Sequence, residues 1–242
     1  RPMGTGTDQA RDEARLVTIE VADGPEAWEA AGFTVAGDRV QIGPVGILLT
    51  GRPAAGRRGG ITGWTVSGLI VTDGLLDGLP TDGRSNALSA GAAAPPPGTA
   101  PHPNGVVGLD HIVVLTPDLE RTIAAMEAAG LDLRRIRETT SNGSPMRQAF
   151  FKVGPIVLEV VSGDVGSGQP VADAPATFFG LAVDVDDLDA TAVVLGEGLG
   201  RIKAAVQAGR RIATIRTKAF DVSVPIAAMD RHGDRTTSDD GR

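Results

Sequence analysis

Hydrophobic and polar positions follow the same order twice in the C-terminal half of the chain. Each round begins with an apolar, β-rich run, continues with a polar helix start and an amphipathic helix, and ends with three shorter apolar runs. In the first round Pro117 and Asp118 open the helix and Gly130 closes it. The strands predicted for this round cover residues 111–115, 131–138, 147–153 and 156–161.

The second round repeats these elements further along the chain. It predicts a helix at 187–195 and strands at 178–185, 201–206, 211–217 and 222–227. Matching the two rounds sets Gly180 opposite His111 and Pro225 opposite Glu159. The pattern therefore predicts two βαβββ units, and only the first has polar side chains at the matched positions.

A weaker copy of the unit precedes them. A short helix begins near Pro25 and ends at Gly32, and strands are predicted at 15–21, 33–36, 39–42 and 45–50. In this copy Thr18 takes the place of His111, and Leu48 takes the place of Glu159. A strand at 61–69 resembles the start of a fourth unit that ends early.

Composition along the chain divides it into five segments. Residues 82–106 are rich in Pro, Ala and Gly and have too few large apolar side chains to form a core, so they are predicted to be a linker. We expect the two sides to be separate packing units, or one unit with a crossing strap. The predicted order is a flexible N-terminus at 1–13, a degenerate module at 14–81, the linker at 82–106, a paired domain at 107–229 and a flexible tail at 230–242.

Charge and composition narrow the classes of function. The 242 residues are 41% hydrophobic, which is ample for a core, and no run is long enough to span a membrane. A net charge of -7 without a basic stripe argues against nucleic acid and anionic membranes as partners. Because the chain has no cysteine, it can form neither a disulfide nor a zinc-thiolate site. A cytoplasmic protein is expected.

The first round carries a family resemblance. The paired βαβββ order, with Gly-Leu-Asp-His-Ile-Val-Val at 108–114 and Leu-Glu-Val at 158–160, resembles the vicinal oxygen chelate superfamily of glyoxalases, bleomycin-resistance proteins and dioxygenases. The resemblance covers residues 107–228, and residues 14–80 only loosely. It implies an α+β fold in which paired βαβββ modules form curled mixed sheets around a cleft. Units of this fold often pair between chains, so a homodimer is consistent with the resemblance alone.

In that family, metal ligands project inward from the first and last strands of each unit. The resemblance makes His111 and Glu159 candidate catalytic residues and candidate ligands for a divalent metal such as Fe, Mn, Ni, Co or Zn. Gly180 and Pro225 cannot ligate through side chains, and two ligands bind such a metal weakly. The remaining histidines, His102 in the linker and His232 in the tail, are poorly placed to help. The other interpretation is that His111 and Glu159 are polar cleft residues without a metal.

Further polar residues on strands are candidates for ligand binding. By alternation Gln148, Phe150 and Lys152 share one face of their strand and Arg147 the other, and one of these faces must line the cleft. Amide and guanidinium groups can hydrogen-bond a carbonyl or carboxylate. The candidates are Arg147, Gln148, Gln207 and Arg211, whereas Arg210 is assigned as a solvated strand end in preference to Arg211.

Three functional hypotheses remain open. The preferred one is a glyoxalase-like protein whose cleft binds a small organic molecule without a complete metal site. The second is a metal-dependent lyase, isomerase or dioxygenase that uses His111 and Glu159, with Glu159 as base or ligand and His111 as ligand or proton donor. The third is a non-catalytic structural or interaction protein whose cleft is filled by its own side chains.

Overall fold

The fold consists of two mixed sheets and a few short helices, seen in a computed structural model that describes residues 13–52, 59–83, 100–141, 143–163 and 173–231. The smaller sheet has the strand order β2-β3-β1-β4-β6-β5 and the larger has the order β12-β13-β14-β11-β7-β10-β9-β8. None of the described helices is long and apolar enough to cross a membrane.

The N-terminal part forms the smaller sheet and one helix. Its elements are β1 (Arg15–Val21), α1 (Pro25–Ala30), β2 (Arg39–Ile42), β3 (Val45–Leu49), β4 (Ile61–Ser67), β5 (Leu75–Leu76) and β6 (Leu79–Asp82). The strand expected at 33–36 is wrong, since this stretch makes only an isolated bridge between Ala36 and Arg39. Phe33 is instead a core side chain packed against Trp28, with their ring centroids 4.9 Å apart.

The C-terminal part contains both predicted βαβββ units in one sheet. The first unit comprises β7 (Val106–Leu115), α2 (Leu119–Ala128), β8 (Asp132–Ser141), β9 (Ser144–Val153) and β10 (Ile156–Gly163). The second comprises β11 (Thr177–Val185), α3 (Leu188–Leu195), η2 (Gly196–Gly198), β12 (Lys203–Ala204), β13 (Arg211–Ile215), η3 (Thr217–Phe220) and β14 (Ile226–Asp230). The side chains of Asp118 and Asp187 cap α2 and α3, as the sequence pattern indicated.

The second unit differs from the prediction in its last strands. β12 has only two residues, and the strand expected at 222–227 begins at Ile226 instead. The segment before it turns through η3 and Asp221, which adopts a left-handed conformation, and it buries Val222 and Val224. Apolar residues in this segment therefore reflect burial in a turn and not a strand, a distinction that hydrophobicity alone cannot make.

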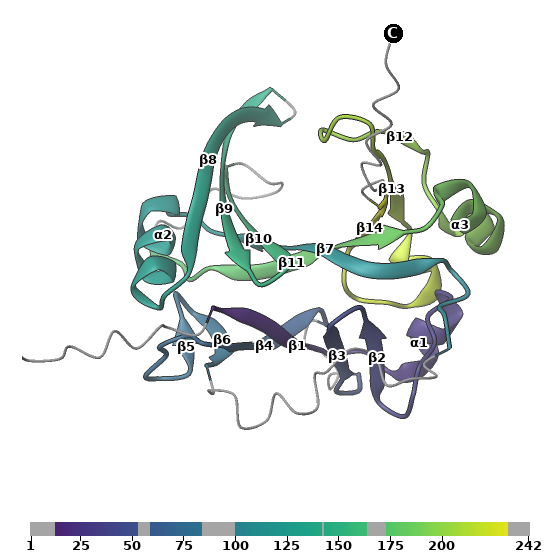
Figure 1. Cartoon of the computed structure of the whole chain (residues 1–242), viewed down its shortest axis with the longest axis horizontal. Coiled ribbons are helices and arrows are strands. Elements are labelled where there is room, and N and C mark those ends of the chain that lie inside the picture. Colours follow the sequence, from purple (N-terminus) through teal and green to yellow (C-terminus); the bar gives the residue numbers. More distant parts are fainter. Residues whose placement is uncertain (1–12, 53–58, 84–99, 142, 164–172, 232–242) are drawn as a thin grey trace, which may run out of the picture.

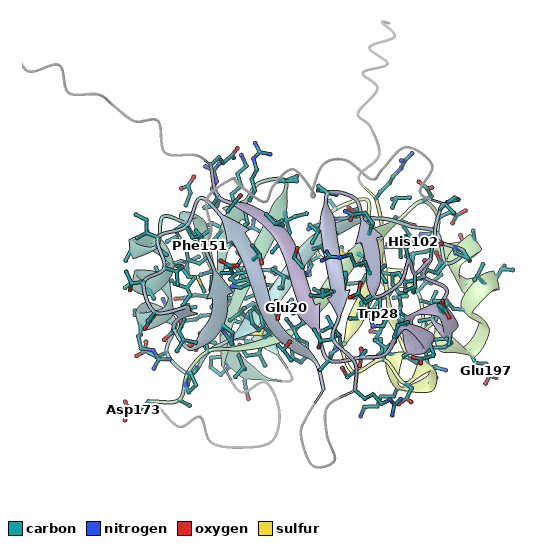
Figure 2. All side chains as sticks on the ribbon, turned by 90° about the horizontal axis from the view of Figure 1, so that it is seen from below. Glu20, Trp28, His102, Phe151, Asp173 and Glu197 are labelled. Atoms are coloured by element: carbon teal, nitrogen blue, oxygen red, sulfur yellow. The ribbon has the colours of Figure 1, made fainter. Side chains whose placement is uncertain are left out.

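The larger sheet is bent into a cup (Figure 1). Strands β10, β7, β11 and β14 form its floor, while β8 and β9 rise at one end and β12 and β13 at the other. The smaller sheet lies beneath the floor, on the convex side, and Figure 2 shows its strands from below. Along β10, Leu158 and Val160 face this buried layer, whereas Val157 and Glu159 face the concave side.

One hydrophobic core joins the two sheets. A single cluster of buried side chains includes Trp28 of α1 and Trp64 of the smaller sheet together with Phe151 and Ile112 of the larger one. Of the two arrangements expected for the linker, the structure therefore supports one packing unit. The last linker residues form the strap between the halves and lie on the smaller sheet: the buried His102 accepts a hydrogen bond at Nδ1 from the Thr34 amide and donates through Nε2 to the Gln41 carbonyl.

Candidate functional site

A β-bulge on the cup floor brings two polar side chains together. Across the β7–β11 pairing, Ala182 is opposite His111 and Val183 is opposite Leu109, so Asp110 is the extra residue. Leu109 and Ile112 both point into the core, which leaves Asp110 and His111 together on the concave side. Asp110 Oδ1 then lies 2.6 Å from His111 Nδ1, although neighbouring residues of a regular strand point to opposite faces.

Arg210 anchors this pair from the other half of the cup. Its guanidinium is almost fully buried and donates to Asp110 Oδ2 at 2.6 Å, to Asp184 Oδ1 and to Gln207 Oε1. Its Nε donates to the Asp230 carbonyl at 2.6 Å. Burial alone would raise the pKa of Asp110, but the hydrogen bonds from His111 and Arg210 outweigh it and lower this pKa to about 2. Asp110 is therefore ionised at neutral pH.

Glu159 and Gln148 continue the polar chain across the floor. His111 Nε2 lies 3.5 Å from Glu159 Oε2, and the Gln148 side-chain amide donates to Glu159 Oε1. Gln148 itself is buried, and its Oε1 atom has no hydrogen-bond partner among the described residues. A buried acceptor without a donor is costly, so a donor group on a bound molecule would stabilise it.

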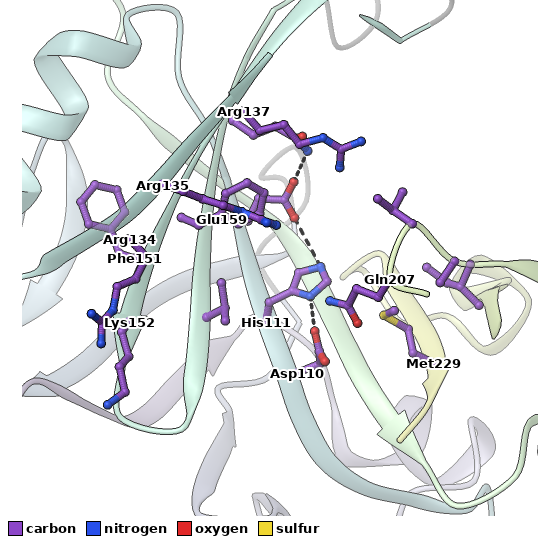
Figure 3. Close-up of a pocket in the computed structure, with 16 residues that line it drawn as sticks. Asp110, His111, Arg134, Arg135, Arg137, Phe151, Lys152, Glu159, Gln207 and Met229 are labelled. Carbon is purple, nitrogen blue, oxygen red and sulfur yellow. Dashed lines mark hydrogen bonds and ion pairs between the residues drawn. The ribbon is translucent and has the colours of Figure 1, made fainter. Parts of the chain in front are cut away.

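These side chains border a cavity on the concave face of the cup, with a volume of about 480 Å³ (Figure 3). This volume falls within the roughly 300–1,000 Å³ of small-molecule sites. The walls come from both halves of the cup. The lining residues are Asp110, His111, Arg134, Arg135, Arg137, Gln148, Phe150, Phe151, Lys152, Val157, Glu159, Ala205, Val206, Gln207, Ile212 and Met229.

Four of the six predicted site residues meet at this cavity. His111, Glu159, Gln148 and Gln207 all line it. Alternation along β9 placed Gln148, Phe150 and Lys152 on one face, and this is the face that borders the cavity.

The other two predicted ligand-binding residues lie outside the cavity. Arg147 points away from it because of the same alternation on β9, and it pairs with Glu120 and Glu138. The half-exposed Arg211 forms ion pairs with Asp187, Asp189 and Asp230, beside the start of α3.

Sequence reasoning missed two features of this site. Arg210 was assigned as a solvated strand end, but it is the buried partner of Asp110. An isolated acid in the apolar run before His111 was a signal for a buried cation, because an unpaired carboxylate is rarely buried. The arginines of β8 were not considered as cavity residues, although Arg135 and Arg137 share one face by alternation.

The register of the second unit bears on whether a metal fits. His111 pairs with Val157, two residues before Glu159, and Leu181 pairs with Ile226 in the second unit. His111 lies seven residues before Asp118, the cap of α2, and Gly180 lies seven residues before Asp187, the cap of α3. Gly180 is therefore the counterpart of His111. Gly180 is level with Pro225, which makes Ala227 the counterpart of Glu159 in place of the expected Pro225.

The residues present do not fit a metal site of the kind the resemblance implies. A Cβ atom on Gly180 would lie 2.5 Å from the Pro225 carbonyl oxygen, so this position has no room for a ligating side chain. Ala227 has no donor atom, and the described residues contain no group of three or more His, Asp or Glu side chains that could hold a metal. Two donors, His111 and Glu159, fall short of the usual three or more.

Residues 110–214 match the profile of the Glyoxalase/Bleomycin resistance protein/Dioxygenase superfamily. No curated protein matches the sequence.

Among solved structures, the chain is similar to a triple mutant of 4-hydroxymandelate synthase from Streptomyces coelicolor. The TM-score is 0.61 with 15% identity, over 92% of this chain and 94% of that one. It is also similar to a xylose isomerase-like TIM barrel/4-hydroxyphenylpyruvate dioxygenase fusion protein, with a TM-score of 0.61 and 10% identity, over 96% of this chain and 52% of that one. At these identities the likeness concerns the fold. Residues 110–214 therefore match the glyoxalase, bleomycin-resistance and dioxygenase superfamily, and the paired βαβββ cup is similar in fold to these solved structures.

Proposed function

We propose that the cup binds a small organic molecule without the help of a metal ion. The observation that carries this proposal is the cavity itself, which opens on the side where the superfamily's metal ligands would lie. It is bordered by a buried acceptor, Gln148 Oε1, that has no partner within the described part of the chain. The cavity also argues against a cleft filled by its own side chains. Arg210 supplies a fixed positive charge to the floor through Asp110, so the polar chain is held together by protein groups alone.

A ligand screen on metal-free protein tests this proposal. Protein treated with chelator and then dialysed is screened by thermal shift against small organic acids, alcohols and amides, and hits are confirmed by calorimetry. We expect binding that is unchanged by chelator and weakened by Gln148→Leu, which removes the buried acceptor while keeping a similar side-chain volume. Binding that requires stoichiometric metal and vanishes in His111→Ala would contradict the proposal and favour a metal-dependent lyase, isomerase or dioxygenase.

The Asp110, His111 and Glu159 chain supports a second candidate function, metal-free proton transfer. Because Asp110 is ionised, His111 Nδ1 carries a proton that it donates to Asp110, and the other ring nitrogen faces Glu159. His111 Nε2 and Glu159 Oε2 lie close enough together to exchange a proton with a hydroxyl or carbonyl of a molecule bound beside them. Arg210 is then a positioning residue, since it fixes the carboxylate that orients the imidazole.

Two readouts test proton transfer separately from binding. Nitrogen-15 NMR of the ring should report the Nδ1–H tautomer of His111 in the wild type and its loss in Asp110→Asn. Ligands found in the screen are then incubated in deuterated buffer with wild type or His111→Asn. Deuterium incorporation by the wild type that is lost in the variant supports the candidate, whereas equal rates with both proteins and with buffer alone refute it.

A further inference from the structure

The cavity has an uneven distribution of charge. Four basic side chains line it, namely Arg134, Arg135, Arg137 and Lys152, against the two acids Asp110 and Glu159. With His111 neutral the lining carries a formal charge of 4 − 2 = +2, although the whole chain carries -7. A positive cavity in a negative protein concentrates anions locally, because a low-dielectric cleft focuses the field of the charges that line it.

Two of these basic side chains are neutralised by nearby acids. Lys152 Nζ lies 2.6 Å from Glu13, and Arg134 lies 3.2 Å from Asp132. Arg135 and Arg137 have no carboxylate partner among the residues that the structure describes, and both project from β8 toward the cavity. The basic charge of the β8 wall that has no nearby acid therefore belongs to these two arginines, whereas the two acids of the lining lie on the floor.

Arg135 is held by an aromatic ring. Its guanidinium carbon lies 4.6 Å from the centroid of Phe150, in a cation–π contact. Stacking orients the guanidinium plane and leaves its N–H groups at the edge, where they can bind a planar anion such as a carboxylate. Phe150 shares the cavity with the apolar side chains of Val157, Ile212 and Met229, so the same space also accepts an apolar body.

We infer that the ligand of this cavity is a small organic carboxylate, with its anionic group bound by Arg135 and Arg137 on β8 and its apolar part lying over Phe150. This assignment rests on the proposed binding function and names the class of ligand. The floor, which bears Glu159 and the buried acceptor of Gln148, repels a carboxylate. The anion is therefore directed to the wall and the uncharged part of the ligand to the floor.

A matched pair of probes tests the inference. The probes are 3-phenylpropionate and its uncharged amide, which have nearly the same shape, and their affinities are measured by calorimetry on metal-free protein. A charge-assisted hydrogen bond is worth about 1.5–3 kcal/mol, so we expect the acid to bind about 10- to 100-fold more tightly than the amide. The preference should shrink as ionic strength rises, because salt screens exposed charges.

Arginine variants locate the anion site. Arg137→Gln and Arg135→Gln should each remove most of the preference for the acid and leave affinity for the amide nearly unchanged. Arg147→Gln is the matched control, since Arg147 lies on the neighbouring strand with its side chain paired outside the cavity. An equal loss in Arg147→Gln would point to a general charge effect and overturn the assignment to the wall.

The remaining outcomes separate the inference from the proposed function. Equal affinity of wild type for acid and amide overturns the carboxylate site but leaves the binding cleft intact. If neither probe binds while the wider screen yields other ligands, the inference fails and the proposed function stands. If the wider screen also yields nothing, the proposed function fails as well.

Discussion

Replacing Arg210 by Met should destabilise the fold, because Arg210 is the buried cation that joins the two halves of the cup. The change removes ion pairs to Asp110 and Asp184, whose side chains are 10% and 23% exposed. Lowering the pKa of Asp110 from 3.8 to about 2 corresponds to about 1.8 × 1.36, or roughly 2.4 kcal/mol, of stabilisation of the carboxylate. His111 and Arg210 both contribute to this stabilisation, so about half is assigned to Arg210.

The larger effect comes from the carboxylates that are left behind. Removing one partner of a buried ion pair typically costs about 3–5 kcal/mol, because the remaining charge is no longer compensated. The partial exposure of Asp184 lets water reach that group, so we expect a loss of about 3 kcal/mol, at the low end of this range. Asp110→Asn removes one of the uncompensated charges, so the double variant should be less destabilised than the sum of the single variants, with a coupling of about 1 kcal/mol or more.

Urea unfolding measures this loss with two independent probes. Both tryptophans are buried in the N-terminal part, Trp28 on α1 and Trp64 on β4. Their fluorescence therefore reports on that part, while circular dichroism reports on all strands. Coincident transitions are expected because the two sheets share one core. Arg211→Met is the control, since the neighbouring Arg211 is exposed and its loss should change the midpoint little. A loss below about 1 kcal/mol without coupling to Asp110 would refute the role given to Arg210.

Three further predictions concern pH, the linker and the second unit. Because the pKa of Asp110 is lowered in the folded state, the stability it contributes is fully present above about pH 4 and is lost toward pH 2. Between these pH values the free energy of unfolding should fall more steeply in wild type than in Asp110→Asn. Burial lowers the pKa of His102 in spite of its hydrogen bond to Gln41, so the stability it contributes is present above about pH 6.5 and falls below it, where the unfolded chain gains a proton. The unfolding midpoint of wild type should therefore fall between about pH 7.5 and 5.5, and that of His102→Gln should change less. Equal slopes for the two proteins would contradict this. Gly180→Ala should cost about 1–3 kcal/mol in urea unfolding because its Cβ would meet the Pro225 carbonyl, and a neutral substitution would show that the two strands can move apart.

The fold followed from the sequence where periodicity and turn residues agreed. The helix caps at Asp118 and Asp187 and the four strands of the first unit were indicated by local pattern, and all of them form. The hydrophobic pattern predicted a strand wrongly around Val222 and Val224, because these side chains are buried without belonging to a strand. Side-chain alternation placed Gln148 and Arg147 on opposite faces of β9 but left open which face borders the cavity, which the structure shows to be that of Gln148.

The site was harder to predict because it depends on an irregularity. A bulge changes which residues share a face, and nothing in the apolar run around His111 marks its position. The contact between Arg210 and Asp110 joins residues a hundred positions apart, through the packing of two units against each other. Local patterns carry no information on such a pairing, so Arg210 could be assigned only by its immediate neighbours, which are typical of a solvated turn.

The differences between the two units also bear on our proposal that the cup binds its ligand without a metal. In the first unit His111 and Glu159 keep their places on the floor, whereas in the second unit the matched positions have become a glycine packed on a proline carbonyl and an alanine. Arg210 belongs to the second unit, and its guanidinium reaches the floor, where it forms an ion pair with Asp110. A metal ion bound by His111 Nε2 and Glu159 would compete with the Gln148 side-chain amide, which donates to Glu159. Under the proposed function, the arginines of the β8 wall are then the groups that select the ligand.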